Sequence, residues 1–268
     1  MSHDPLAGGV FGSAGYARLP RRLEEISPGA HNSEKADVFG VADRLKAVQA
    51  VLGGRHLGKA IDLGGYTGFF PMSLIDAGMI ESATVYDADS DLMRIGGARA
   101  SRLGIADRIE FVPQAIDLNF VRQLPSVDTV LCLNLIHHAG STFDIAEVQR
   151  VGWERYSEDW LGHLRSKCRV LIFSVGLKRS KPKYWDVPND ERPLRLKRTM
   201  ERMNWSVLYD ANVEDIRRFG VERANGRFTN SAGGARARSY WRRFRNLSRR
   251  SIGIRRDKLQ DYHLYILE

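Results

Sequence analysis

The sequence predicts an α/β protein with a doubly wound, mostly parallel sheet of seven strands. Short apolar runs alternate with segments of helical periodicity along most of the chain, and glycines follow several of these segments. Strands and helices that alternate in this way are joined by right-handed crossovers, which place helices on both faces of the sheet. With 268 residues, 43% of them hydrophobic, the chain can build the core that this fold requires.

The N-terminal part of the chain is expected to be an arm or lid followed by a helix. Residues 1–35 are rich in glycine and proline and contain few apolar runs, which is typical of an arm rather than a packed element. The next segment, 35–52, has a helical stripe of apolar residues at Val38, Val41, Leu45, Val48 and Leu52. We expect residues 36–268 to form one domain.

Seven apolar runs predict the strands of the sheet. They cover residues 60–63, 83–86, 109–112, 129–135, 169–175, 206–209 and 262–267. Helical segments are expected at 69–77, at 91–103, through Val148, Trp160 and Leu164, and at 194–203. The fourth run, TVLCLNL, is almost entirely apolar, as expected for a central parallel strand. Ligands of such sheets bind at the carboxyl ends of the strands, so functional residues should follow the strands directly.

Composition narrows the class of protein. No apolar run approaches the roughly 20 residues of a membrane span, and the residues after Met1 have no basic segment that leads into an apolar stretch. We therefore expect a cytoplasmic protein without a transmembrane segment. The two cysteines, Cys132 and Cys168, lie in predicted strands, and this placement favours free buried thiols in a reducing compartment.

Positive charge is concentrated late in the chain. The formal net charge is +9, and much of it lies in an Arg-rich insertion at about 212–261, before the last strand. Within the motif SYWRRFR, Arg242 and Arg243 stand between aromatic residues and are candidates to bind phosphates or carboxylates. This would suit RNA, a nucleotide-linked sugar or an acidic polysaccharide. The helical spacing of Tyr240, Phe244 and Leu247 equally favours an amphipathic helix on the core, or one on a membrane surface.

The most specific local motif is DLGGYTG, residues 62–68, directly after the first predicted strand. Glycines allow a sharp turn and the close approach of a ligand, and the helix that follows directs its N–H groups at that ligand. Asp87 ends the second strand, where a carboxylate can accept hydrogen bonds from both hydroxyls of a ribose. The dinucleotide fingerprint Gly-x-Gly-x-x-Gly is not met, because Tyr66 replaces its second glycine and Gly68 comes one residue early.

These residues resemble the class I S-adenosylmethionine-dependent methyltransferase family. Asp62, Gly64 and Gly68 fit the family's first motif, and Tyr66 stands where its middle glycine is usual. The resemblance covers about residues 36–211 and the last strand. It implies a Rossmann-like sheet with the last strand antiparallel, methyl transfer as the activity, and S-adenosylmethionine as the cofactor.

The resemblance also implies roles for particular residues. Asp62 and its loop, which includes Gly65, would bind the methionine part of the cofactor, and Asp87 would bind the ribose. Many members carry an acid near the adenine after the third strand; here Ala115 takes that position, and Asp117 is the substitute we expect. The end of the fourth strand, from Asn134, looks like the family's fourth motif, which borders the methyl group.

His137 and His138 follow the fourth strand, where a general base would be needed if the acceptor is a hydroxyl. The alternative is a structural or cofactor-lining role for the pair. We expect no metal site, because adjacent residues rarely chelate one ion together and no Cys/His cluster supports them.

Further residues are candidates to contact the acceptor. Tyr16 and His31 would do so if the arm folds over the cofactor, although Asn32 or Ser33 in the same stretch is equally suited to cap the first helix. Trp185 follows the fifth strand together with the basic run KRSKPK. Asn134 is not followed by Pro-Pro-aromatic, which disfavours methylation of the exocyclic amines of bases, and neither cysteine lies in a Pro-Cys motif.

The sequence thus favours a methyltransferase that acts on a hydroxyl or amine of a small-molecule or saccharide-type acceptor, anionic acceptors included. Two alternatives stay open beside it: an RNA methyltransferase that uses the Arg-rich segment, and a non-catalytic cofactor-binding protein. An enzyme that binds a nicotinamide or another nucleotide is a further reading of the glycine loop.

Overall fold

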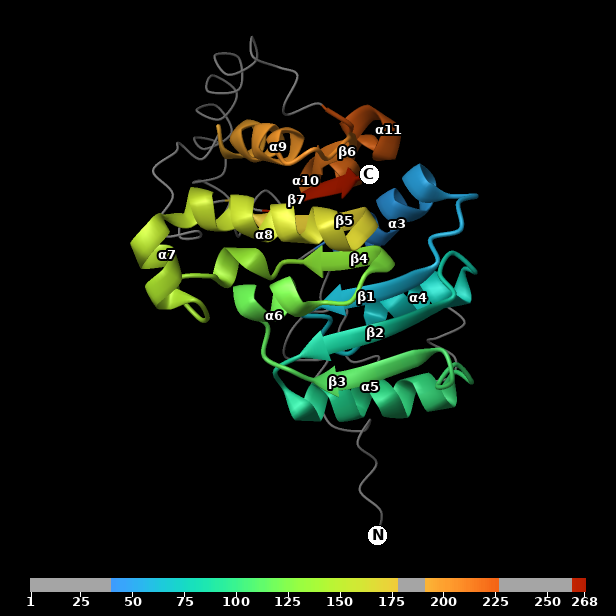
Figure 1. Ribbon diagram of the computed structural model, residues 1–268. Helices are drawn as coiled ribbons and strands as arrows, with labels where there is room; N and C mark the ends of the chain where they lie inside the picture. The colour runs from blue at the N-terminus through green and yellow to red at the C-terminus, as the bar shows by residue number, and fades with distance from the viewer. Residues whose placement is uncertain (1–39, 178–190, 227–261) are drawn as a thin grey trace, which may run out of the picture.

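The computed structural model describes residues 40–177, 191–226 and 262–268, and its centre is a seven-stranded sheet in the order β3-β2-β1-β4-β5-β7-β6 (Figure 1). The strands are β1 (Lys59–Leu63), β2 (Ser82–Asp87), β3 (Ile109–Pro113), β4 (Val127–Leu133), β5 (Cys168–Gly176), β6 (Val207–Asn212) and β7 (Tyr262–Leu267). Strands β1 to β5 pair in parallel, whereas β7 runs antiparallel to both β5 and β6. This order and the reversed last strand confirm the predicted Rossmann-like, mostly parallel sheet with an antiparallel last strand.

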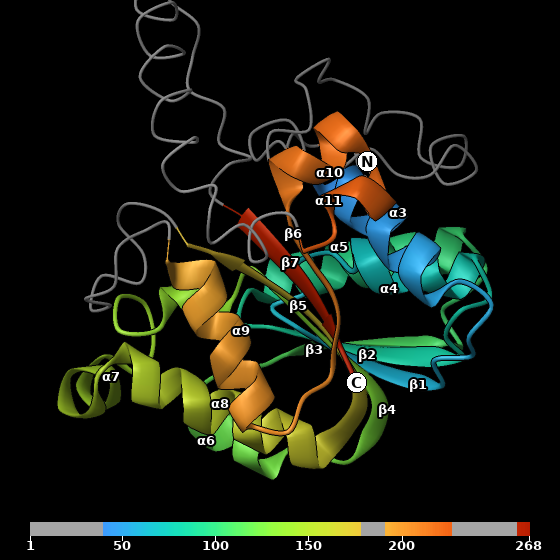
Figure 2. The same ribbon diagram turned by 90° about the horizontal axis from the view of Figure 1, so that it is seen from above.

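Helices cover both faces of the sheet (Figure 2). One face carries α3 (Val41–Leu52), α4 (Phe69–Asp76), α5 (Ser90–Arg102), α10 (Val213–Phe219) and α11 (Val221–Ala224). The other carries α6 (Leu118–Gln123), α7 (Ile145–Val151), α8 (Trp153–Lys167) and α9 (Arg192–Arg202). A short 3-10 helix, η1 (Ile136–His138), follows β4. None of the described helices is long and apolar enough to cross a membrane.

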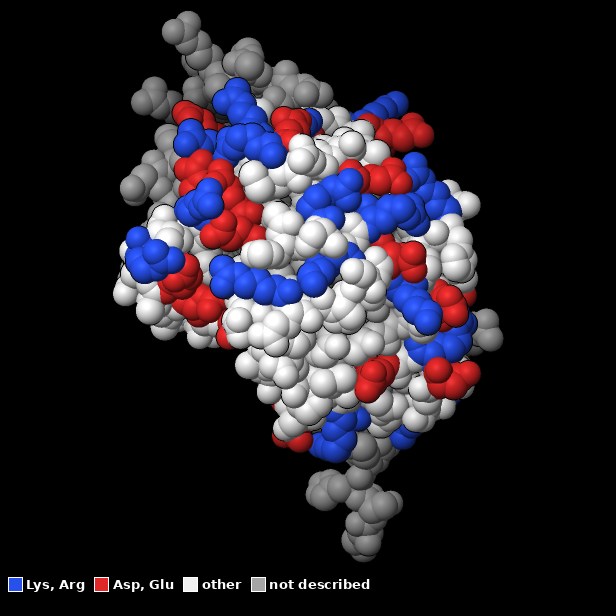
Figure 3. Space-filling view, in the orientation of Figure 1, with Lys and Arg blue, Asp and Glu red and all other residues white. Residues whose placement is uncertain are grey.

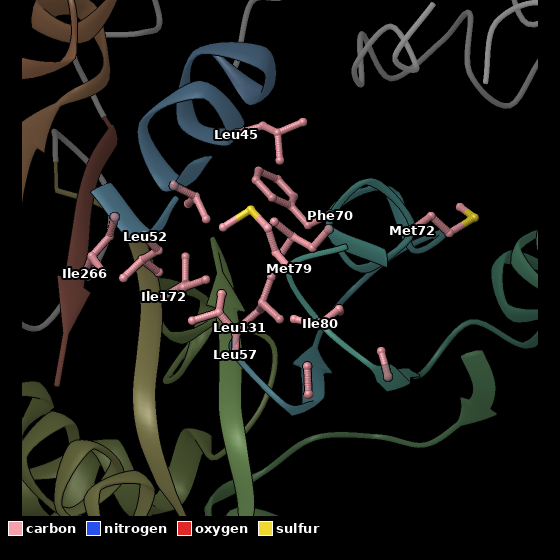
Figure 4. Packing of buried hydrophobic residues seen from close by; sticks show 14 of the residues in the cluster. Leu45, Leu52, Leu57, Phe70, Met72, Met79, Ile80, Leu131, Ile172 and Ile266 are labelled. Carbon is pink, nitrogen blue, oxygen red and sulfur yellow. The ribbon is translucent and has the colours of Figure 1, made fainter. Parts of the chain in front are cut away.

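Two apolar clusters, one on each face, hold the helices to the sheet. In the first, Leu52 of α3 lies beside Ile172 of β5 and Ile266 of β7, and Phe70 of α4 faces Leu45 of α3 (Figure 4). Full burial of a side chain of this size contributes about 1.5–3 kcal/mol. Helix α3 is therefore packed firmly against β5 and β7.

The chain departs from the predicted elements at two backbone positions. The predicted helical region through Val148 and Trp160 is two helices, because Gly152, with a φ of 79°, separates α7 from α8. The fourth strand ends at Leu133 rather than at 135, because Asn134 has a left-handed φ of 61° and turns the chain into η1. This second departure places the side chain of Asn134 at the edge of the sheet where ligands bind.

The described part of the predicted 212–261 insertion begins with α10 and α11, which pack against α3. An ion pair of 2.6 Å between Arg217 Nε and Asp43 Oδ2 joins α10 to α3. The remainder of the insertion, residues 227–261, lies outside the described residues, as does the predicted arm at 1–35.

Candidate active site

A pocket opens at the carboxyl ends of β1, β2 and β4 and is closed on one side by α3 and the start of α4. Its cavity volume is about 230 Å³. Its lining residues are Val41, Arg44, Asp62, Gly64, Gly65, Tyr66, Thr67, Phe69, Phe70, Asp87, Leu133, Asn134, Leu135 and His138. This is the edge at which mostly parallel sheets bind ligands.

Close backbone packing shapes the turn from β1 into α4. The N–H groups of Gly64 and Gly65 both donate to the carbonyl oxygen of Tyr86, at 2.9 and 3.2 Å, which draws the turn onto β2. A Cβ atom on Gly65 would lie 2.6 Å from Asp62 Oδ2 and 2.5 Å from Val85 Cγ1. Any side chain at position 65 would therefore displace the carboxylate of Asp62, so glycine is required here.

Tyr66 has a left-handed backbone, with a φ of 56°, at the position where a glycine would be unstrained. Its N–H donates to Asp87 Oδ2 at 3.1 Å, while the N–H of Asp89 donates to Asp87 Oδ1 at 3.1 Å. Two backbone donors from different elements thus fix the carboxylate of Asp87. The Asp87 carboxylate thereby connects the strained turn after β1 to the end of β2.

Asp62 and Asp87 bring two carboxyl groups into the same pocket. Asp62 is 2% exposed, and its burial, together with the nearby charge of Asp87, raises the pKa of the Asp62 carboxyl from 3.8 to about 8. Near neutral pH, the Asp62 carboxyl is therefore mostly protonated in the folded protein. A cationic ligand group beside it would favour its ionised form.

A chain of hydrogen bonds links two further lining residues, Arg44 of α3 and Asn134 at the end of β4, through Ser174 of β5. Arg44 of α3 is 1% exposed, and its Nη1 donates to Ser174 Oγ at 3.2 Å. Ser174 Oγ in turn donates to Asn134 Oδ1 at 3.1 Å, and the backbone N–H of Asn134 donates to the Ser174 carbonyl oxygen at 2.7 Å. The Arg44 guanidinium also lies 5.9 Å from the centres of the Phe70 and Tyr262 rings. These contacts fix the side chain of Asn134 at the pocket wall.

The two predicted histidines occupy different places. His138 lines the pocket, whereas His137 is 6% exposed and does not belong to its wall. The Nδ1 atom of His137 accepts a hydrogen bond of 3.2 Å from the backbone N–H of Gly176, so the neutral ring carries its proton on Nε2. The two rings lie 4.4 Å apart. His137 therefore lies beside the His138 ring, outside the pocket lining.

The structure brings most of the predicted cofactor residues together and leaves some apart. Those that line the pocket are Asp62, Gly64, Gly65, Tyr66, Asp87 and Asn134. Gly68 lies just outside the lining and begins α4 with a φ of 75°. Asp117 does not line the pocket; it caps α6, where its Oδ1 accepts a hydrogen bond of 2.7 Å from the N–H of Phe120. The predicted acceptor contacts lie outside the described residues: Tyr16, His31, Trp185, Arg242 and Arg243.

Two residues of the site, Arg44 and Ser174, were not predicted from the sequence. Position 44 lies on the same side of the helix as Val41, Leu45 and Val48, so a charged residue there is placed on the buried face. Ser174 interrupts the apolar run of β5 in the same way. A polar residue within an otherwise apolar stripe is the signal that could have identified both. Among the described residues, no group of three or more His, Cys, Asp or Glu side chains is arranged to hold a metal ion.

No protein-family model and no curated protein matches this sequence. Several solved structures are similar to most of this chain. A SAM-dependent methyltransferase from Geobacter sulfurreducens in complex with S-adenosyl-L-homocysteine is 14% identical over 94% of this chain and 99% of that chain, with a TM-score of 0.47. The [4+2]-cyclase SpnF is 14% identical over 85% and 81%, with a TM-score of 0.47. The bifunctional kinase-methyltransferase WbdD is 19% identical over 71% of this chain and 39% of that chain, with a TM-score of 0.45.

Proposed function

We propose that this protein is an S-adenosylmethionine-dependent methyltransferase that acts on a hydroxyl or amine of a small-molecule or saccharide-type acceptor. The proposal rests on the hydrogen bond that joins the glycine turn after β1 to the carboxylate of Asp87. The N–H of Tyr66 holds the Asp87 carboxylate at the pocket, one strand away from the buried Asp62. S-adenosylmethionine carries a ribose and an ammonium group. The Asp87 carboxylate suits the ribose, Asp62 suits the ammonium group, and the glycine turn between them leaves room for the ligand.

The residues present fit the cofactor. Asp87 would accept hydrogen bonds from the ribose hydroxyls, since two backbone N–H groups already set its orientation. Asp62 would face the ammonium group of the methionine part, and its burial would strengthen that interaction. Gly65 leaves the space beside Asp62 that any larger residue would fill. Bound S-adenosylmethionine supplies a methyl group activated by a positively charged sulfur.

The pocket residues then have to align the acceptor and remove its proton. Alignment of two reactants in a fixed geometry can supply about 7–11 kcal/mol of the barrier. His138 is the side chain suited to act as general base, because it lines the pocket, and such a base contributes about 10²–10⁴-fold to the rate. His137 would position it, held by the N–H of Gly176.

The RNA alternative stays a prediction, because Arg242 and Arg243 lie outside the described residues. On the face formed by α8 and α9, arginines and acids are interspersed (Figure 3). Arg195 of α9 pairs with Glu154 of α8 at 2.7 Å, and Arg202 pairs with Glu158 at 2.5 Å. This described face therefore lacks the uniform positive charge by which proteins bind a phosphate backbone.

Binding of S-adenosylhomocysteine, followed by calorimetry, tests the proposal. We expect Asp87→Asn to weaken binding by about 10–100-fold, because a charged hydrogen-bond partner of the ribose is lost. Asp91→Asn is the matched control: this acid lies four positions along the chain, its side chain is 79% exposed, and it does not line the pocket. Equal affinity of the parent and Asp87→Asn would count against the ribose assignment. Transfer of labelled methyl groups to fractions of a cell extract separates an enzyme from a non-catalytic binder.

A further inference from the structure

The polar groups of the pocket are divided between its two halves. The acids Asp62 and Asp87 come from β1 and β2, whereas Arg44 and Asn134 come from α3 and the end of β4. In the sheet order β2-β1-β4-β5, the two acids follow neighbouring strands, and Asn134 follows the strand on the far side of β1, next to β5. The part of the pocket near β1 and β2 suits cationic and hydroxyl groups of a ligand. The part near β4 and β5 suits anionic groups that accept hydrogen bonds.

The hydrogen bonds from Arg44 to Asn134 have a fixed direction. A guanidinium can only donate, so Ser174 Oγ must accept from Arg44. The hydroxyl has a single proton, and it donates that proton to Asn134 Oδ1. One lone pair of the Asn134 amide oxygen is thereby used, and the NH₂ group is the end of the amide directed away from Ser174. Among the described residues, that NH₂ group makes no hydrogen bond.

We propose that this chain of hydrogen bonds makes Asn134 a donor toward the acceptor substrate, and that the acceptor therefore carries an anionic oxygen beside the atom that is methylated. The inference rests on the proposed function, since it concerns the second substrate of methyl transfer. The buried charge of Arg44 favours the same ligand, because it sets a positive potential on this wall. An exocyclic amine would need an acceptor here, and one of the two lone pairs of Asn134 Oδ1 is already taken by Ser174, whereas both amide protons are available to a substrate oxygen.

One competing occupant must be distinguished. S-adenosylmethionine has a carboxylate of its own, and this wall could hold it instead of an acceptor. The two cases differ in whether the wall stays open once the cofactor product is bound. A carboxylate probe that binds together with S-adenosylhomocysteine occupies the acceptor position, whereas one that competes with it occupies the cofactor position.

The experiment follows the side-chain NH₂ signals of ¹⁵N-labelled protein by NMR, with Asn134 identified by the loss of its signals in Asn134→Asp. Benzoate and benzylamine, which are similar in size and opposite in charge, are titrated into the full-length chain with and without S-adenosylhomocysteine. We expect benzoate to shift the Asn134 signals saturably in the loaded protein, and benzylamine to leave them in place. Ser174→Ala should weaken benzoate by about five- to tenfold, because the amide loses its orientation.

Ser157→Ala is the matched control, since Ser157 is also buried, at 1% exposure, and donates only to the Glu154 carbonyl oxygen within α8. Its affinity for benzoate should equal that of the parent. The inference is overturned if benzylamine shifts Asn134 and benzoate does not, if neither does, if Ser174→Ala binds benzoate as the parent does, or if S-adenosylhomocysteine displaces benzoate. Failure of S-adenosylhomocysteine itself to bind would instead refute the proposed function, and the inference with it.

Discussion

Replacing Asp62 by asparagine should stabilise the cofactor-free protein, by an amount that grows with pH. The folded protein holds the pKa of this carboxyl at about 8, first through burial and then through the charge of Asp87, against 3.8 in the unfolded chain. Between these two values the folded state binds a proton that the unfolded state has lost. The contribution of Asp62 to stability is therefore complete below the unfolded pKa and is lost as the pH rises through about 8.

The difference in unfolding free energy between the parent and the variant changes with pH at the slope expected for one titrating proton. Each pH unit within this window lowers the free energy of unfolding of the parent by about 1.4 kcal/mol relative to the variant, because asparagine does not titrate. From about pH 5 to about pH 7 the difference between the two proteins should grow by roughly 2.7 kcal/mol, and it should level off above about pH 8. All other groups titrate alike in both proteins and cancel in the difference.

Urea unfolding of the two proteins at several pH values measures this difference. The amide of the variant makes hydrogen bonds of its own, which shift the difference by a constant and leave its slope unchanged. Equal m-values in the two proteins ensure that the comparison is one of stability. A difference that does not change between about pH 5 and about pH 8 would mean that Asp62 is already ionised in the folded state, and the reasoning about the buried acid would be refuted.

Three further predictions follow from the same pocket. At pH 7, S-adenosylhomocysteine should release close to one proton from the parent and none from Asp62→Asn, as read from calorimetry in buffers of different ionisation enthalpy; equal release from both would exclude Asp62 as the source. Gly65→Ala should lower the free energy of unfolding by about 1–3 kcal/mol, because the added Cβ would clash with Asp62 and Val85. Gly97→Ala is the control and should cause no such loss, because a Cβ there meets nothing within 4 Å. Similar losses of the two variants in urea unfolding would argue against a specific clash at position 65. For a hydroxyl acceptor, His138→Gln should lower kcat by about 10²–10⁴-fold and abolish the acidic limb of its pH profile, because a general base must be deprotonated to act; an unchanged profile would exclude His138 as the base.

The sequence predicted the sheet well because strand signals are local. Apolar runs of four to seven residues identified all seven strands. The errors lie where one residue changes the backbone direction: the left-handed Asn134 ended β4 early, and Gly152 divided a predicted helix. Helix α6 was not predicted; it is only six residues long, and its start depends on the cap that Asp117 provides.

The site was predictable where its residues belong to one turn, and not where distant segments meet. Asp62 and Asp87 follow adjacent strands, so topology alone places them together. The contact from Arg44 to Ser174 spans 130 positions of the chain and depends on how α3 packs over β5. No local pattern encodes such a pair, although each of the two residues is a polar exception within an apolar stripe. The same topology could not separate His137 from His138, because their difference is set by the N–H of Gly176.

A crystal structure of the protein with S-adenosylhomocysteine tests the central claim most directly. We expect the ribose hydroxyls within hydrogen-bonding distance of the Asp87 carboxylate, and the ammonium group of the homocysteine part beside Asp62. A nucleoside bound away from the turn after β1, or a pocket that stays empty at saturating ligand, would contradict the account.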